Sequence, residues 1–388
     1  MTVTSPAGFR AAGVTAGLKA SGRPDVALVV NDGPLAVAAG VFTANRFAAA
    51  PVLWSRQVVA DGEVRAVILN SGGANACTGP EGFADTHRTA EHVAAALTAA
   101  GVETGAGDVA VCSTGLIGER LPMDRLLAGV DAVIAALTPD GGAAAAVSIM
   151  TTDTVPKTAA VTTGGYTVGG MAKGAGMLAP ALATMLVVVT TDAVIDADLA
   201  ESALRIATSL TFDRIDSDGC MSTNDTVLLL ASGASGVAPD PASFTDAVTE
   251  VCADLARQLI GDAEGASKDI DITVINAATE DDALEAARAI SRSNLLKCAI
   301  HGEDPNWGRI LSALGTTAAA FEPDRVDVAI NDVWVCKEGG VGESRDLVDM
   351  TGRLARIVVD LRAGSASASV LTNDLTAEYV HENSAYST

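Results

Sequence analysis

The chain has 388 residues and a formal net charge of −23; 49% of its residues are hydrophobic and 19% are charged. A chain of this length and composition can bury a large core, and it is typical of globular proteins and not of disordered ones. The negative charge argues against binding to nucleic acid or to an anionic membrane surface, because either partner needs a basic face on the protein.

The cysteines and histidines are scattered along the chain. The six cysteines form no CxxC pair, and the four histidines show no metal-ligand spacing with one another or with cysteine. No apolar run approaches the length of a membrane span, and the first residues lack the order of a signal peptide. We therefore expect a cytoplasmic protein that holds no metal ion.

Short aliphatic runs alternate with amphipathic helices in the first third of the chain. Strands are expected over residues 27–30, 64–69 and 109–112, because each is a compact aliphatic run next to Gly, Asn or Ser. Helices are expected over residues 83–100 and 123–137, where apolar residues recur at spacings of three and four.

The second half of the chain repeats this mixture. The sequence predicts helices over 196–210, 243–260 and 279–294, and strands over 271–275, 326–330 and 367–371. Thr279 with Asp282 three positions later resembles a capping box at a helix start. Strands that alternate with helices in this way indicate an α/β or α+β architecture.

One stretch, residues 173–189, combines flexibility with a rigid strand. A glycine-rich segment that contains Lys173 leads to a strand expected from Met185 to Val189. Thr184 stands where the loop meets the strand, and a hydroxyl nucleophile needs such a position to be both reachable and held still. A lone threonine before a strand is usually just a strand residue; the surrounding glycine-rich loop favours the nucleophile instead.

Several other polar and glycine-rich blocks follow the same order as in a known family. They are residues 70–79, 113–118, 150–154, 222–226, 261–265 and 304–309. Together with 173–189, these blocks resemble the ornithine acetyltransferases, which are the glutamate N-acetyltransferases of arginine biosynthesis. That family is related in fold and mechanism to self-processing aminopeptidases, and the resemblance extends over nearly the whole chain.

The resemblance implies a fold of stacked β-sheets flanked by helices and a peptide bond that the chain cleaves by itself, between Ala183 and Thr184. The products are an α chain of residues 1–183 and a β chain of residues 184–388, which stay folded together and associate as α2β2 or larger. It implies no cofactor, because the enzyme itself carries the acetyl group.

The implied chemistry depends on Thr184. Its hydroxyl attacks the preceding carbonyl, the acyl group moves from nitrogen to oxygen, and hydrolysis of the ester leaves Thr184 as a new N-terminus. An α-amine has a pKa near ~8, so a useful fraction is neutral and can act as general base beside the hydroxyl.

The resemblance also assigns roles to other residues. Thr114 and Gly115 match the oxyanion hole, and Glu264 matches the residue that binds the δ-ammonium group of ornithine. The substrate contacts are Thr151, Lys173, Thr184, Glu264, Asn383 and Thr388. Ser387 departs from the pattern, since the family usually has arginine before the last threonine.

Local sequence leaves simpler interpretations open for these residues. Thr114-Gly115 is compatible with an ordinary turn, and Glu264 with a solvated loop acid. Lys173 beside glycines suggests phosphate binding, but no G-x-x-x-x-G-K-[ST] string is present.

The predicted function is transfer of acetyl from N2-acetyl-L-ornithine to L-glutamate by a ping-pong route through an acetyl ester on Thr184. Two alternatives remain open: a self-processing amidohydrolase or aminopeptidase that uses water as acceptor, and an unprocessed binding protein. Whether acetyl-CoA also serves as donor, which would add N-acetylglutamate synthase activity, is not decided by any residue type.

Overall fold

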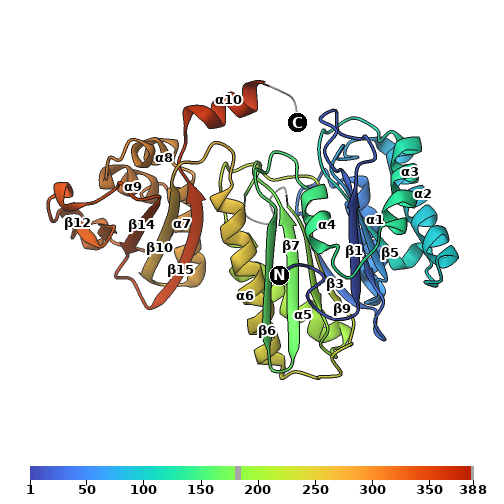
Figure 1. Ribbon diagram of the computed structural model, residues 1–388. Helices are drawn as coiled ribbons and strands as arrows, with labels where there is room; N and C mark the ends of the chain where they lie inside the picture. The colour runs from blue at the N-terminus through green and yellow to red at the C-terminus, as the bar shows by residue number, and fades with distance from the viewer. Residues whose placement is uncertain (180–184, 386–388) are drawn as a thin grey trace. The chain divides into compact units, whose positions relative to one another are not determined.

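The computed structural model describes residues 1–179 and 185–385, which form two compact units (Figure 1). Among the described residues, the N-terminal unit comprises Met1–Asp213 and Cys220–Leu259, and the C-terminal unit comprises Arg214–Gly219 and residues 260–385. The catalytic junction predicted at residues 183 and 184 lies outside the described residues.

A four-stranded sheet forms one layer of the N-terminal unit. Its strand order is β1 (Phe9–Val14), β2 (Val26–Asn31), β4 (Ala66–Asn70), β5 (Val109–Ser113). β4 and β5 run parallel, whereas the other neighbours are antiparallel. Two helices, α2 (Gly79–Ala99) and α3 (Met123–Ala135), cover one face of this sheet with a shared apolar cluster.

A five-stranded sheet forms the second layer. Its order is β3 (Val37–Phe42), β9 (Thr226–Ala231), β8 (Leu186–Thr191), β7 (Tyr166–Lys173), β6 (Lys157–Thr163). β8 and β9 are parallel and buried along their whole length, which explains why both are nearly continuous aliphatic runs.

The two sheets pack face to face around a common core. Val67 and Leu69 of β4 belong to the same buried cluster as Val188 of β8 and Leu228 of β9. On the outer face of the second sheet lie α5 (Ala197–Leu210) and α6 (Pro241–Gly261), as Figure 1 shows. The predicted stacked sheets flanked by helices are therefore confirmed in this unit. Two short helices complete it, α1 (Ala50–Val58) and α4 (Gly142–Ser148).

The C-terminal unit contains a six-stranded sheet with helices on one face. The strand order is β13 (Gly340–Val341), β12 (Val333–Lys337), β11 (Asp327–Ile330), β14 (Leu354–Asp360), β10 (Asp269–Ala277), β15 (Ala366–Asn373). The helices of this unit are α7 (Glu280–Ser291), α8 (Asn294–His301), α9 (Trp307–Leu314) and α10 (Ala377–Ala385). β10 alternates between buried and half-buried side chains, as a sheet covered on one face requires.

Most predicted elements exist, with shifted ends. The helix predicted over 279–294 ends at Ser291, and α8 begins at Asn294, because the Ser293 hydroxyl accepts a hydrogen bond from Leu296 N–H and starts a new helix. The predicted cap at Thr279 is confirmed by a 3.1 Å hydrogen bond from Asp282 N–H.

Short 3₁₀ turns lie between these elements at Val59–Asp61, Ala106–Asp108, Phe212–Arg214, Pro323–Arg325 and Arg345–Leu347. Within the described part of the chain, the helices are all too short or too polar to cross a lipid bilayer.

Candidate active site

The turn after β5 places Thr114 and Gly115 beside a glycine loop. Thr114 N–H donates to Asn70 C=O at 3.0 Å, and Gly73 N–H donates to Thr114 C=O at 3.1 Å. Gly115 has φ +131°, and a Cβ at this position would lie 2.8 Å from Gly73 N. The turn therefore requires glycine at residue 115, both for its backbone conformation and for the close approach.

Amide and hydroxyl side chains brace this turn. Asn224 Nδ2 donates to Ala74 C=O at 2.6 Å and to Ser113 C=O at 2.8 Å. Ser113 Oγ donates to Asn70 Oδ1 at 2.6 Å. Three of the sequence blocks, 70–79, 113–118 and 222–226, thus meet around Thr114, although they lie far apart in the chain.

Lys173 reaches the same place from the other sheet. It is the last residue of β7 and only 1% exposed, and its Nζ donates to Thr114 Oγ1 at 3.4 Å. Its backbone is in register with Leu186, the first residue of β8. The start of β8 and the lysine therefore lie side by side, because the antiparallel pair β7–β8 aligns them.

A buried carboxylate connects Lys173 with Thr151. Asp153 accepts hydrogen bonds from Lys157 Nζ at 2.6 Å, from Gly174 N–H at 2.7 Å and from Thr151 N–H at 2.9 Å. Burial by itself would raise the pKa of the Asp153 carboxyl, but the ammonium groups of Lys173 and Lys157 and these hydrogen bonds lower it to about 2. Asp153 is thus ionised at neutral pH and balances two buried lysines.

A second buried carboxyl group, Asp225, precedes β9 and contacts the backbone just before β8. Its Oδ1 accepts a hydrogen bond from Met185 N–H at 3.1 Å, and its side chain is completely buried. Its Oδ2 has no hydrogen-bond partner among the residues that the structure describes. Burial raises the pKa of Asp225 well above its ordinary value, against the effect of the Met185 N–H and the Lys173 charge. This buried carboxyl group therefore holds the backbone of the residue that follows Thr184.

Lys19 is a further cation, and its charge interacts with those of Lys173 and Asp153. Its Nζ donates to Met150 C=O at 2.6 Å and to Pro24 C=O at 2.8 Å. Burial, opposed by the charge of Asp25 and assisted by that of Lys173, lowers the pKa of Lys19 to about 8. Sequence reasoning missed Lys19 because nothing around it signals a site. It missed the raised pKa of Asp225 because burial cannot be inferred from the block that contains it.

The C-terminal unit brings together two other predicted residues. Asn383 Nδ2 of α10 donates to Glu264 Oε2 at 2.9 Å. Gly265 has φ +63°, and a Cβ there would lie 2.3 Å from Tyr379 N, so this glycine lets the loop pack against α10. Glu264 is half-buried and Asn383 is exposed, which leaves the carboxylate accessible to a ligand.

The predicted site residues thus fall into an N-terminal group (Thr114, Gly115, Thr151 and Lys173) and a C-terminal pair (Glu264 and Asn383). The three predicted residues Ala183, Thr184 and Thr388 lie outside the described residues. Within residues 1–179 and 185–385, no three His, Cys, Asp or Glu side chains are grouped so that they could hold a metal ion.

The block 304–309 contributes to the packing of two helices. Asn306 caps α9 by accepting a hydrogen bond from Arg309 N–H, and the Arg309 guanidinium donates to Leu295 C=O of α8. This arginine therefore joins α8 and α9.

The N-terminal group has the parts of an acyl-transfer centre. A hydroxyl and a glycine N–H sit on a rigid turn, where they can stabilise an oxyanion, and a buried lysine lies between them and the start of β8. The class that this geometry defines is an acyltransferase.

Comparison with known proteins agrees with this class. Residues 10–388 match the model of the ArgJ family. The chain is 68% identical to the arginine biosynthesis bifunctional protein ArgJ of Streptomyces coelicolor and 67% identical to that of Streptomyces avermitilis, in each case over the whole of both chains. A solved ornithine acetyltransferase from Mycobacterium tuberculosis, in complex with ornithine, is 65% identical; the match covers 48% of this chain and 96% of that chain, with a TM-score of 0.46.

The chain belongs to the ArgJ family. It is an enzyme, a transferase of arginine biosynthesis.

Proposed function

We propose that this enzyme transfers the acetyl group of N2-acetyl-L-ornithine to L-glutamate through an acetyl ester on Thr184. The observation that carries the proposal is the convergence of the Thr114–Gly115 turn, Lys173 and the start of β8 in one buried region. Thr184 is joined by one peptide bond to Met185, which Asp225 holds there.

The first step is self-cleavage. The Thr184 hydroxyl adds to the Ala183 carbonyl, the C–N bond breaks, and the nitrogen takes up the proton that the hydroxyl released. Water then hydrolyses the resulting ester, which frees the Ala183 carboxylate and the Thr184 hydroxyl beside the amine that the shift produced. The products are an α chain of residues 1–183 and a β chain of residues 184–388. Both belong partly or wholly to the N-terminal unit, so we expect them to stay folded together.

The second step is acetyl transfer. The Thr184 amine takes the proton of its own hydroxyl as the oxygen attacks the acetyl carbonyl. The Thr114 hydroxyl and the Gly115 N–H donate to the oxyanion, an interaction worth about 3 kcal/mol of barrier for each donor. Ornithine leaves with the proton on its amine. The amine of glutamate then attacks the acetyl ester and restores the Thr184 hydroxyl.

Substrate binding uses charged side chains. In this proposal Glu264, held by Asn383, receives the δ-ammonium group of ornithine, as charge-assisted hydrogen bonds favour. Lys173 and Thr151 receive the α-carboxylate, and Thr388 supplies a further contact.

The relatives at 67–68% identity are named bifunctional proteins. We therefore include acetyl-CoA as a second acetyl donor, which makes N-acetylglutamate directly. We also propose an α2β2 or larger assembly. The expected compartment is the cytoplasm, and the six free cysteines support it, since disulfides are rare there.

The decisive experiment is the intact mass of the denatured protein beside a Thr184→Ala variant. Two chains with the second starting at Thr184, and one uncleaved chain in the variant, are the expected result. Incubation with N-acetylornithine alone should then add one acetyl group to the β chain. A full-length wild-type chain, or fast turnover without an acetylated Thr184 peptide, contradicts the proposal.

The same assay separates the transferase from an amidohydrolase. Ornithine release should depend on added glutamate once one equivalent of acetyl-enzyme has formed. Release at the same rate in buffer alone would identify water as the acceptor.

A further inference from the structure

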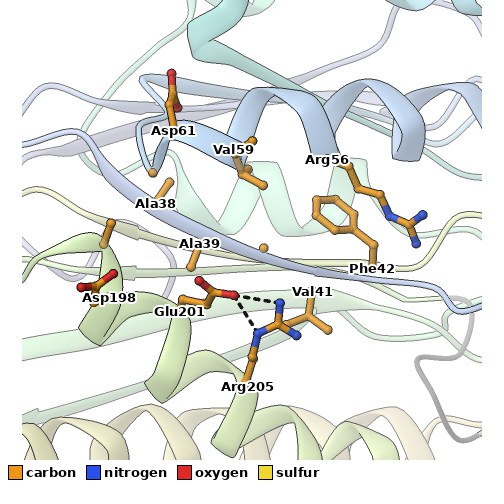
Figure 2. A pocket seen from close by; sticks show the side chains of 14 residues that line it. Ala38, Ala39, Val41, Phe42, Arg56, Val59, Asp61, Asp198, Glu201 and Arg205 are labelled. Atoms are coloured by element: carbon orange, nitrogen blue, oxygen red, sulfur yellow. Dashed lines mark hydrogen bonds and ion pairs between the residues drawn. The ribbon is translucent and has the colours of Figure 1, made fainter.

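A polar cavity of about 630 Å³ lies in the N-terminal unit along the edge of the five-stranded sheet. Its floor is β3, from Ala38 to Phe42, and its walls are α5 on one side and the end of α1 with the following turn on the other (Figure 2). The charged side chains that line it are Arg56, Asp61, Asp198, Glu201 and Arg205. None of the residues assigned to acetyl transfer belongs to this cavity.

The backbone of β3 is open toward the cavity. Ala38 N–H donates away from β9, to Gly62 C=O, whereas Thr43 N–H donates toward β9, to Asp225 C=O. Because these directions alternate along a strand, Gly40 and Phe42 also point their backbone groups away from β9. Outside the β3–β9 ladder, the N–H and C=O of Gly40 have no hydrogen-bond partner within the described part of the chain.

At the opposite edge of the same sheet, a side chain binds the outward backbone groups of the edge strand. On β6, Thr158 N–H donates to Gln258 Oε1 at 3.1 Å, and Gln258 Nε2 donates to Thr158 C=O at 3.0 Å. The Gln258 amide thus occupies the outward backbone groups. On β3, residues 62–64 pair with the start of the strand at Val37, and among the described residues the outward groups beyond Ala38 N–H have no such cap. The strand contains no proline and no charged residue, and its register with β9 is continuous. Edge strands without these devices are templates for another strand.

Charge is distributed unevenly along the groove. Figure 2 shows Asp61 and Asp198 beside Ala38 at one end, and Arg56 and Arg205 toward Phe42 at the other. Arg205 pairs with Glu201 at 2.9 Å, and both side chains are more than half exposed. A guanidinium carries five N–H donors, so this pair leaves Arg205 able to bind a second carboxylate.

These features define the ligand. The span from Ala38 to Phe42 is roughly 13 Å at the rise of a β-strand, which is too long for one amino acid and matches an extended peptide of about five residues. An antiparallel peptide begins at the Phe42 end, beside the arginines, and finishes at the Ala38 end, beside the aspartates. Its first residue should therefore be acidic and its last residue basic.

We propose that the β3 groove binds an extended peptide segment of a partner protein, acidic at its N-terminal end and basic at its C-terminal end. The peptide adds an antiparallel strand to β3 through the outward backbone groups of Gly40 and Phe42. This mode takes affinity from main-chain hydrogen bonds and specificity from the charges at the two ends.

The test uses two capped synthetic peptides and the full-length, self-processed protein. The probes are acetyl-Glu-Val-Thr-Val-Lys-amide and its charge reversal, acetyl-Lys-Val-Thr-Val-Glu-amide, titrated by calorimetry. We expect the first to bind roughly tenfold more tightly, since reversal replaces two attractive pairs at the groove ends by repulsive ones.

A double charge swap, Asp198→Lys with Arg205→Glu, leaves Asp61 and Arg56 in place, so the charges at each end largely cancel. The variant should lose this preference while still binding both peptides, which a merely structural role of the two residues does not produce. Arg88→Glu, an exposed substitution on α2, is the matched control and should leave the preference unchanged. Thermal melting of each variant establishes that it is folded.

Backbone pairing is tested on the peptide itself. Methylating the amide nitrogens of residues two and four, or of residue three, blocks the N–H groups on one side of the peptide at a time. One of these probes should lose binding and the other should retain it.

Four results would overturn the proposal. They are no binding of either peptide at millimolar concentration, equal tolerance of every methylation, displacement of the peptide by free glutamate or lysine, and a changed oligomeric state in the charge-swapped variant. The last two would assign the groove to a small molecule or to a second copy of this chain.

Discussion

The N-terminal group and the C-terminal pair of site residues lie in opposite environments. Lys173 and Asp153 are 1% and 2% exposed and are held by several hydrogen bonds, whereas Glu264 is half-buried and bonded to an exposed asparagine. Stabilisation of a transition state requires preorganised groups in a water-poor setting. A group that recognises the charge of an arriving substrate has to be accessible beforehand. The comparison teaches that the two charged groups proposed to meet the substrate differ in burial: Lys173, beside the proposed acetyl-transfer centre, is enclosed, whereas Glu264, proposed for the δ-ammonium group, is accessible.

The largest effect is expected from Lys173→Met. The substitution removes a cation beside Thr114 and the start of β8, and the rate of acetyl transfer should fall by about 10³. Lys157→Met is the matched control, because it removes an equally buried lysine from the same carboxylate, Asp153. It should lower the melting temperature and leave the rate of the folded fraction close to that of the wild type. Equal losses of rate in both variants would show that Lys173 has only a structural role.

The next effect, on stability, is expected from Asp153→Asn. Removing the carboxylate leaves two buried ammonium groups without their counter-ion, which should cost about 3 kcal/mol at pH 7. Because the folded pKa of Asp153 is about 2, below its ordinary value of 3.8, its contribution is present above pH 4 and is lost as the pH falls toward 2. Denaturant unfolding of both proteins should show the difference shrinking over that range. A difference independent of pH would mean that the carboxylate is not ionised in the folded enzyme.

A smaller effect is expected from Glu264→Gln, and it should appear in binding. The amide keeps a hydrogen-bond acceptor but loses the charge that attracts the δ-ammonium group, so KM for N-acetylornithine should rise roughly tenfold with kcat little changed. Self-cleavage and melting temperature should stay as in the wild type. A large loss of kcat at unchanged KM would place Glu264 with the chemical group and break the comparison.

The smallest effect at neutral pH is expected from Asp225→Asn. Burial raises the pKa of the wild-type carboxyl and so disfavours the charge that asparagine lacks, and the asparagine oxygen can accept the Met185 N–H. Because the pKa of Asp225 is higher in the folded than in the unfolded protein, its carboxyl group stabilises the fold fully below about pH 4. This contribution is lost as the pH rises through the folded pKa. The free energy of unfolding of Asp225→Asn, relative to that of the wild type, should therefore rise as the pH increases.

Asp225→Ala is the control for that prediction. It leaves Met185 N–H without its acceptor and should cost about 1–3 kcal/mol. If Asp225→Asn folds normally but fails to self-cleave, then the unpartnered Oδ2 acts on the reaction as a proton donor or acceptor, beyond holding the strand.

The sequence predicted the aliphatic strands and the capped helices well, because their signals are local. β2 and β8 follow from continuous apolar runs. α5 begins after Asp196, whose carboxylate accepts a hydrogen bond from Leu199 N–H. β3 and β7 were not predicted, because their alanines and glycines carry little strand propensity. Their pairing partners, β9 and β8, lie elsewhere in the chain and make them strands.

Part of the candidate site could also be found in the sequence. The motif blocks identified Thr114, Gly115, Thr151, Lys173 and Glu264, and the structure brings the first four of these into one unit. Asp225 stood in such a block too, but its raised pKa could not be inferred from the sequence, since a pKa depends on everything that surrounds the group.

The sequence by itself determined the family, the positions of the reactive residue types and most secondary structure, because these are written in short-range patterns. Only the tertiary structure decided which carboxyl groups are ionised, which lysines are buried beside Thr114, and which sheet edge stays open. These properties arise from desolvation and from pairing between segments that are distant in the chain, and neither has a local sequence signal.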